Sequence, residues 1–77
     1  METTLNRLRE GERGRVVSLC LHGGTRRRLV DFGLIEGTDI VCLRRSPAGS
    51  PILFRVRGSM LALRAADSGK IRVERCG

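Results

Sequence analysis

The apolar positions along the chain predict a series of short β-strands. Runs of β-branched and aliphatic residues recur, with glycine or proline between most of them, at residues 15–21, 38–45, 51–57, 60–64 and 70–75. Successive side chains of a strand point to opposite faces, so alternate residues share a face. The residues expected to point inward are Val17, Leu19 and Leu21 in the first run, Ile52, Phe54 and Val56 in the third, and Ile71 and Val73 in the fifth.

Residues 25–32 predict a short helix. Thr25 is a favourable N-cap, and the arginines that follow it are good helix formers. Gly33 stands where a residue in the left-handed conformation ends a helix. With Phe32 as the C-cap, Leu29 and Leu34 occupy the two positions that touch in a Schellman motif.

The segments between the strands carry turn residues. Gly58-Ser59 predicts a tight hairpin turn, Asp67 to Gly69 a second turn, and residues 46–50 a loop. Strands this short suggest a small closed barrel, since closure removes exposed strand edges. We therefore expect a mainly β protein, a barrel of about five strands with one short helix after the first strand, and a single domain over residues 1–77.

The chain is strongly basic. It has 15 basic and 8 acidic residues, for a net charge of +7, and every basic residue except Lys70 is arginine. A positive field favours anionic partners and speeds their encounter. The same charge is also consistent with a solvated basic surface that has no partner.

The cysteines and the N-terminus indicate a cytoplasmic protein. The three cysteines, Cys20, Cys42 and Cys76, are odd in number and far apart, which does not predict a disulfide framework. The first residues lack the apolar core of a signal peptide, and no apolar run reaches the ~20 residues that cross a bilayer.

Catalytic motifs are missing from the sequence, which contains no HExxH, GxSxG, GxxxxGK[ST] or GxGxxG. Cys20, His22 and Cys42 have side chains that transition metals bind. They predict a three-ligand site only if the first two strands bring Cys42 close to the other two. The alternative is that both cysteines are small hydrophobic residues and that His22 lies at a loop edge.

A nucleic-acid-binding barrel is the natural rival for a basic chain. Proteins that bind single strands usually stack bases on aromatic side chains. This chain has no Trp or Tyr, and its two phenylalanines, Phe32 and Phe54, stand at expected core positions. We therefore do not expect nucleic acid to be the main partner. Grooves that read proline-rich peptides need the same aromatic residues.

Taken together, the residues resemble the FeoA family over positions 5–74. The ordered set that carries the resemblance is Leu5, Leu8, Gly11, Gly14, Val16, Arg28, Leu29, Phe32, Gly33, Leu34, Glu36, Gly37, Ile40, Pro47, Gly49, Ser50, Pro51, Val56, Gly58, Leu61, Ala62, Leu63, Arg64, Ile71 and Val73. The resemblance implies an SH3-like barrel with a helix after the first strand. It also implies a small cytosolic, non-enzymatic protein without a cofactor, which accompanies FeoB, a membrane ferrous-iron permease with a cytosolic GTP-binding region.

Polar and loop residues that the barrel does not need are the candidates for contact with that partner. Arg26, Arg27 and Arg28 place positive charge at the positive end of the helix, a small cost that hints at a role. Pro47 and Pro51 pre-order one loop, which lowers the entropy lost on binding. The alternatives to this accessory role are nucleic-acid binding, metal binding through the two cysteines and His22, and weak self-association through an exposed apolar patch.

Overall fold

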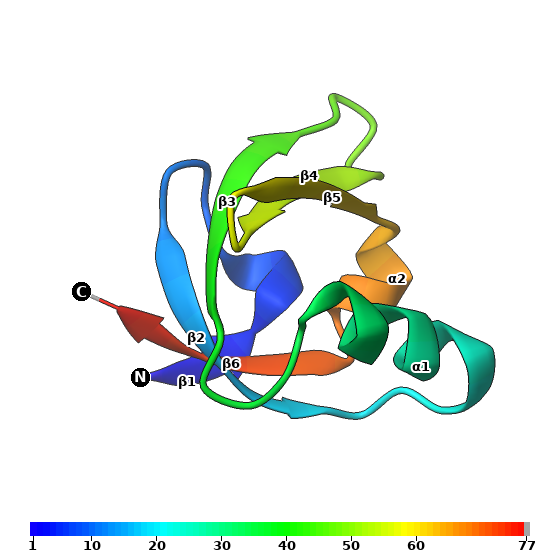
Figure 1. Cartoon of the computed structure of the whole chain (residues 1–77). Helices are drawn as coiled ribbons and strands as arrows, with labels where there is room; N and C mark the ends of the chain where they lie inside the picture. Colours follow the sequence, from blue (N-terminus) through cyan, green and yellow to red (C-terminus); the bar gives the residue numbers. More distant parts are fainter. Residues whose placement is uncertain (77) are drawn as a thin grey trace.

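Six antiparallel strands form one sheet in the order β1-β6-β2-β3-β4-β5. The computed structural model describes residues 1–76, and Figure 1 shows the sheet curled around its core. The elements in chain order are β1 (Glu2–Thr4), the 3-10 helix η1 (Leu5–Arg7), β2 (Arg13–Leu19), α1 (Gly23–Phe32), β3 (Asp39–Arg45), β4 (Ile52–Val56), β5 (Ser59–Leu63), α2 (Ala65–Ser68) and β6 (Ile71–Cys76).

The mainly β barrel with one principal helix agrees with the sequence-based prediction, but three details differ. The additional strand β1 pairs with β6, so α1 follows the second strand and not the first. The strand Glu2–Thr4 is short and has no alternating apolar pattern, so its sequence gives no strand signal. The expected 67–69 turn overlaps the end of a short helix, α2.

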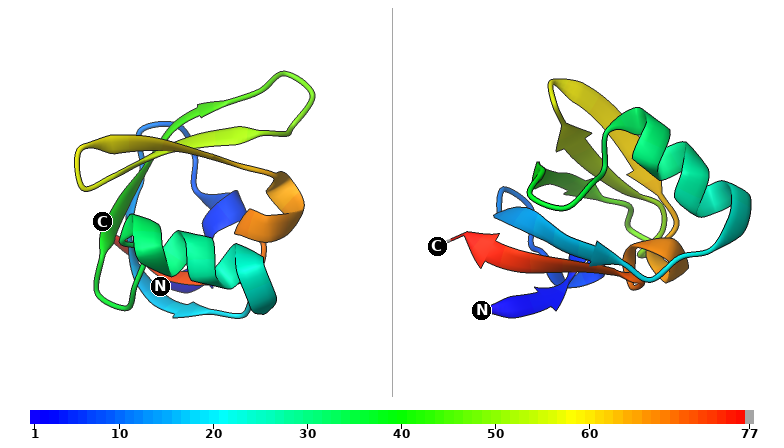
Figure 2. Two further views of the ribbon diagram at one scale, coloured as in Figure 1. Left: turned by 45° about the vertical axis from the view of Figure 1, so that its right-hand side comes forward. Right: turned by 60° about the horizontal axis from the view of Figure 1, so that its bottom comes forward.

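The barrel does not close through hydrogen bonds. Strands β1 and β5 are the two edges of the sheet, and the strand order leaves both without a second neighbour. The two views of Figure 2 show α1 and α2 across the opening between β5 and the opposite half of the sheet. The prediction of a closed barrel was therefore wrong. The edge strands β1 and β5 do not pair with each other, and the two helices cover the opening between them. Within residues 1–76, no helix is both long and apolar enough to cross a bilayer.

The core contains most of the residues that the alternating pattern selected. Its buried hydrophobic members are Leu5, Leu8, Val16, Leu21, Leu29, Leu34, Ile40, Cys42, Ile52, Phe54, Val56, Leu63, Ile71 and Val73. Phe32 was also expected there, but this residue is 37% exposed. It stands in the last turn of α1 on the side that faces the barrel opening.

A β-bulge in β2 explains why the prediction that Val17 points into the core was wrong. Val16 pairs with Val73 and is buried, but the register shifts between Val16 and Ser18. The extra residue at the bulge reverses the faces of the strand. Leu19, beyond the bulge, therefore packs against the core as expected, whereas Val17 is only partly buried.

The C-terminal end of α1 has the predicted Schellman geometry. Gly33 has φ 113°, and its N–H donates to the carbonyl of Val30. The N–H of Leu34 donates to the carbonyl of Leu29 over 2.9 Å. The helix begins two residues earlier than expected, with His22 as an N-cap that makes no side-chain bond, so the capping role predicted for Thr25 was wrong.

The β4–β5 hairpin turn lies one residue earlier than predicted. Val56 pairs with Ser59, which leaves Arg57 and Gly58 as the turn residues. Both have positive φ, 53° for Arg57 and 79° for Gly58, as a type I′ turn requires. Arginine is unusual at such a position, and for this reason the sequence indicated Gly58-Ser59 as the turn residues.

Candidate functional groove

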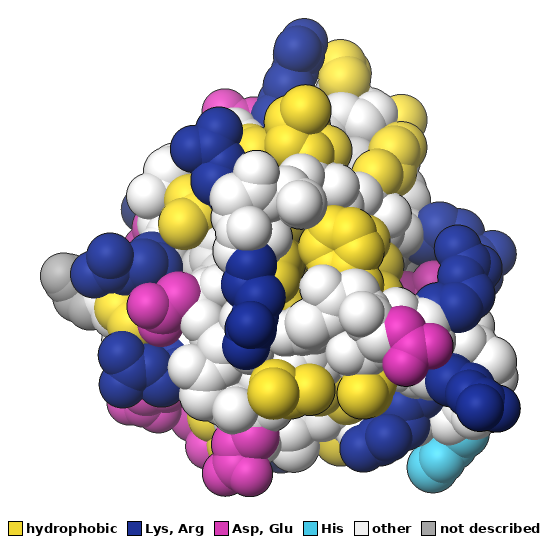
Figure 3. Space-filling view, in the orientation of Figure 1, with side chains coloured by type: hydrophobic (Ala, Val, Ile, Leu, Met, Phe, Trp, Pro, Cys, Tyr) yellow, Lys and Arg dark blue, Asp and Glu magenta, His cyan; other side chains and the backbone are white. Residues whose placement is uncertain are grey.

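A groove with a cavity of about 340 Å³ separates α1 from β5 at the barrel opening. The α1 residues that line it lie on one helix face, as their i, i+3, i+4, i+7 spacing requires, and they are Thr25, Arg28, Leu29 and Phe32. The opposite wall consists of Leu61, Ala62 and Leu63 from β5, continued by Arg64 and Asp67. Figure 3 shows hydrophobic surface in the region between these two elements and basic side chains around the same face.

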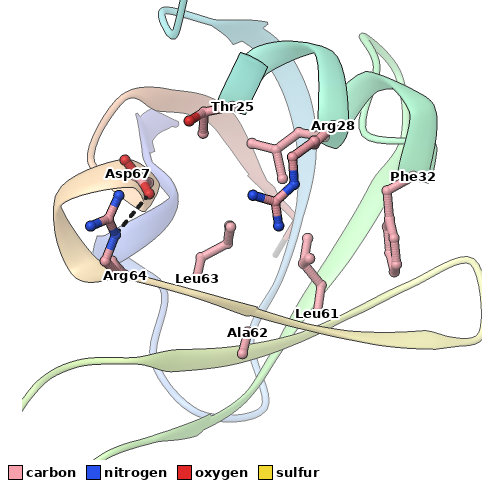
Figure 4. A pocket seen from close by; sticks show the side chains of 9 residues that line it. Thr25, Arg28, Phe32, Leu61, Ala62, Leu63, Arg64 and Asp67 are labelled. Carbon is pink, nitrogen blue, oxygen red and sulfur yellow. Dashed lines mark hydrogen bonds and ion pairs between the residues drawn. The ribbon is translucent and has the colours of Figure 1, made fainter. Parts of the chain in front are cut away.

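The two walls differ in how they present their side chains. In Figure 4, Leu61 and Leu63 point from β5 toward α1, and Ala62 points away from it. Ala62 nevertheless borders the cavity, so its backbone faces the groove. β5 is an edge strand, so one side of its backbone has no strand neighbour.

Positive charge dominates the polar part of the groove. The guanidinium of Arg28 extends from α1 into the space between the walls in Figure 4. None of the ion pairs among residues 1–76 includes Arg28. Arg64 is paired, since its Nε lies 3.3 Å from Oδ2 of Asp67. The groove therefore presents one unneutralised cation beside an apolar floor, an arrangement suited to a carboxylate on an otherwise apolar segment.

The three predicted helix arginines do not lie on one surface. Arg26, Arg27 and Arg28 are all exposed. Arg28 lines the groove, whereas Arg26 lines a separate cavity against β2, together with Val17 and Ser18. Arg27 lines neither of these cavities. Consecutive residues of a helix point about 100° apart, so a run of three necessarily spreads over several faces.

The predicted proline loop lies away from the groove. Pro47 and Pro51 are exposed in the β3–β4 connection, at the top of Figure 1, whereas α1 lies at the lower right. The loop is anchored near α2, where the hydroxyl of Ser50 accepts a hydrogen bond from the N–H of Ala65 over 3.1 Å. The structure therefore does not join the two predicted partner-binding segments into one surface.

Cys20, His22 and Cys42 do not come together. Cys42 is fully buried and pairs with Phe54 on β4, whereas Cys20 and His22 are exposed. Strands β2 and β3 do pair, but through residues 13–15 and 39–41, at the end of β2 far from Cys20. Burial also raises the pKa of the Cys42 thiol, which disfavours the thiolate that metals bind. Within the described 76 residues, no group of three His, Cys, Asp or Glu side chains has the arrangement of a metal site.

Phe32 and Leu61 are groove residues that sequence reasoning missed. The spacing of 25, 28, 29 and 32 does signal a helix face, and Phe32 belongs to it. The sequence does not reveal that this face borders an opening rather than the core, because that depends on which strand lies at the edge. With Phe54 fully buried, Phe32 is the one phenylalanine left at the surface, too few for a base-stacking platform.

The curled antiparallel sheet with helices over its opening defines the class of small SH3-like barrels. The chain matches the sequence profile of the FeoA domain over residues 3–75. The chain therefore belongs to the FeoA family, a family associated with ferrous iron transport.

Two solved structures show the same architecture. The FeoA protein of Chlorobium tepidum is 33% identical, and the match covers 97% of this chain and 71% of that one with a TM-score of 0.93. The FeoA of Stenotrophomonas maltophilia, solved in complex with zinc and described as a prokaryotic SH3 domain protein, is 28% identical, with 94% and 89% of the two chains covered and a TM-score of 0.81.

A third relative is a longer polypeptide. The Fe(2+) transport protein A/Fe(2+) transporter FeoB fusion protein of Porphyromonas gingivalis is 29% identical over 70 residues. The match covers 91% of this chain but only 8% of the fusion protein. In that organism, an FeoA-like segment and an FeoB transporter are thus parts of one chain.

Proposed function

We propose that this protein is a non-enzymatic accessory protein of ferrous iron transport, which binds the cytosolic part of an FeoB-type permease in the cytoplasm. The observation that carries the proposal is the fusion of a related segment to FeoB in Porphyromonas gingivalis. Joining two partners in one chain raises their effective concentration to about the millimolar range, which favours pairs that work in contact. A separate chain must reach the same partner through its own affinity.

The surface of the protein supports a binding role. Its net charge of +7 speeds encounter with an acidic surface. The groove between α1 and β5 combines an apolar floor with the cation of Arg28. Apolar area supplies affinity, and a positioned charge supplies orientation, which is the composition expected of a recognition site.

The test is a calorimetric titration of the protein against the soluble cytosolic domain of FeoB from the same organism, with and without guanine nucleotide, at physiological salt. We expect saturable binding that weakens in the Arg26→Ala/Arg27→Ala/Arg28→Ala triple variant. Absence of binding in every nucleotide condition would contradict an interaction with this domain. The proline loop is tested in the same titration. If the loop contributes to the interface, the Pro47→Ala/Pro51→Ala variant binds more weakly, and unchanged affinity places the loop outside the interface.

A further inference from the structure

The outer side of β5 has hydrogen-bonding groups that no other strand of residues 1–76 uses. The two-residue hairpin makes Val56 and Ser59 a hydrogen-bonded pair, and such pairs alternate along an antiparallel ladder. Ser59, Leu61 and Leu63 therefore bond to β4. The N–H and C=O groups of Met60 and Ala62 point away from β4, toward the free edge. An added strand would find two donors and two acceptors there.

The free edge of β5 carries neither of the two residue types, charged residues and proline, that most often prevent strand addition. Its sequence, Ser-Met-Leu-Ala-Leu, contains no charged residue and no proline. The other edge, β1, is only three residues long and includes Glu2, which forms an ion pair with Arg72. The two edges of one sheet thus differ, and only the edge next to the groove is both apolar and uncharged.

The residues that line the groove determine which side chains an added strand needs. Apolar side chains would pack on Phe32 and Leu61, both partly exposed. A carboxylate would meet Arg28, which extends into the groove without an ion-pair partner among the described residues. A second copy of this chain fits poorly, because two molecules of net charge +7 repel each other and β5 itself has no carboxylate to offer.

We propose that β5 takes an extended, acidic and apolar segment of a protein partner as an additional strand, with a carboxylate of that segment bound by Arg28. The inference rests on the proposed function in one respect, since it identifies the partner with the cytosolic part of FeoB. Strand addition of this kind draws affinity from main-chain hydrogen bonds and specificity from the side-chain pockets beside the edge. The surface that binds is thus the barrel opening and not the whole basic face.

Two variants test the charge and the edge separately. Arg28→Glu reverses the groove charge, and Arg27→Glu is its matched control, with the same change of net charge on the neighbouring helix residue outside the groove. Ala62→Pro removes a free N–H without removing a bond to β4, and circular dichroism checks that it folds. We expect affinity for the FeoB cytosolic domain to fall about ten-fold or more with Arg28→Glu and Ala62→Pro, and less than about three-fold with Arg27→Glu.

Hydrogen exchange of the unmodified protein supplies a measurement that needs no variant. The amides of Met60 and Ala62 should exchange rapidly in the free protein and at least about ten-fold more slowly when the partner is saturating. A binding mode elsewhere on the surface would leave these two amides unprotected.

The outcomes separate the two proposals. Saturable binding with unchanged exchange at Met60 and Ala62, or with equal losses for Arg28→Glu and Arg27→Glu, overturns strand addition and leaves the proposed function standing. If the domain does not bind, peptides that tile the cytosolic segments of the permease are titrated next. Binding of one acidic segment with protection of both amides supports strand addition, and failure of every segment overturns both proposals. A concentration-dependent dimer of the free protein with protected β5 amides would instead make a second copy the occupant.

Discussion

The glycine that ends α1 provides the sharpest test of the fold, through the substitution Gly33→Ala. Gly33 has φ 113°, well outside the region that residues with a Cβ prefer. Holding an L-residue at such positive φ costs about 1–2 kcal/mol. A Cβ at this position would also lie 3.0 Å from Cδ and 3.2 Å from Nε of Arg57. Because Arg57 is exposed and its side chain flexible, that contact adds at most about 1 kcal/mol.

One effect acts in the opposite direction. Alanine reduces the conformational freedom of the unfolded chain, which stabilises the folded state by about 0.4–1 kcal/mol. The middle values of these three contributions give a net expected loss of about 1.3 kcal/mol in the free energy of unfolding. A domain of this length has about 4–12 kcal/mol in total, so the loss is a substantial fraction. It corresponds to a decrease of about 5–10 °C in Tm.

Urea unfolding followed by far-ultraviolet circular dichroism measures this loss, since the chain has no tryptophan or tyrosine for fluorescence. Gly69→Ala is the matched control. Gly69 has φ −68°, and an added Cβ would meet its neighbours at 3.6 Å, an ordinary contact distance. We expect Gly69→Ala to be neutral or to stabilise the protein by up to about 1 kcal/mol.

Two results would refute this reasoning in different ways. Equal stabilities for Gly33→Ala and Gly69→Ala would show that the positive φ carries no penalty. If the loss at Gly33 disappears when Arg57→Gly is added, the contact with Arg57 and not the backbone conformation is its cause. A double-mutant cycle with the two single variants measures that coupling directly.

Further predictions concern the hairpin, the thiols and a partly buried arginine. Arg57→Asn should raise the free energy of unfolding by about 0.5–1 kcal/mol, because asparagine tolerates the positive φ of a type I′ turn, and an unchanged urea midpoint would contradict this. In the native protein, the exposed Cys20 should react with a thiol reagent much faster than the fully buried Cys42, as mass spectrometry of partly labelled protein would show. Burial raises the pKa of Cys42, so above pH about 8.5 the unfolded chain releases a proton that the folded chain keeps; stability should fall with rising pH by up to about 1.4 kcal/mol per pH unit, and more steeply than in Cys42→Ala. Arg45→Met should cost about 1–3 kcal/mol in urea unfolding, because Nη2 of Arg45 donates to the backbone carbonyls of Leu8, over 2.9 Å, and Asn6; a loss below about 0.5 kcal/mol would show that water replaces it.

Sequence patterns were most informative where local geometry decides the structure. Alternation placed Ile52, Phe54 and Val56 inside because a paired strand has only two faces. The end of α1 was predictable to the residue, since a glycine followed by Leu34 satisfies both bonds of a Schellman motif within six residues. The order and spacing of glycines and apolar residues were also sufficient to indicate the family.

The errors have equally specific causes. The bulge that moves Val17 out of the core depends on the pairing of β2 with β6, more than 50 residues away in the chain. Arg57 adopts a conformation that its own side chain disfavours, so no local preference could place the turn there. Cys42 lies in the core and far from Cys20 because β2 and β3 pair through the end of β2 that is distant from Cys20.

The candidate site shows the same division. The sequence by itself determined the basic charge, the helix with its arginines and the strand containing Leu61, since these follow from residue types and short-range spacing. Only the tertiary structure decided that β5 is an edge strand, that α1 crosses the barrel opening beside it, and that Arg28 rather than Arg26 or Arg27 faces the groove. Strand order and helix placement arise from contacts between distant segments, and local preferences along the chain do not encode which of those contacts form.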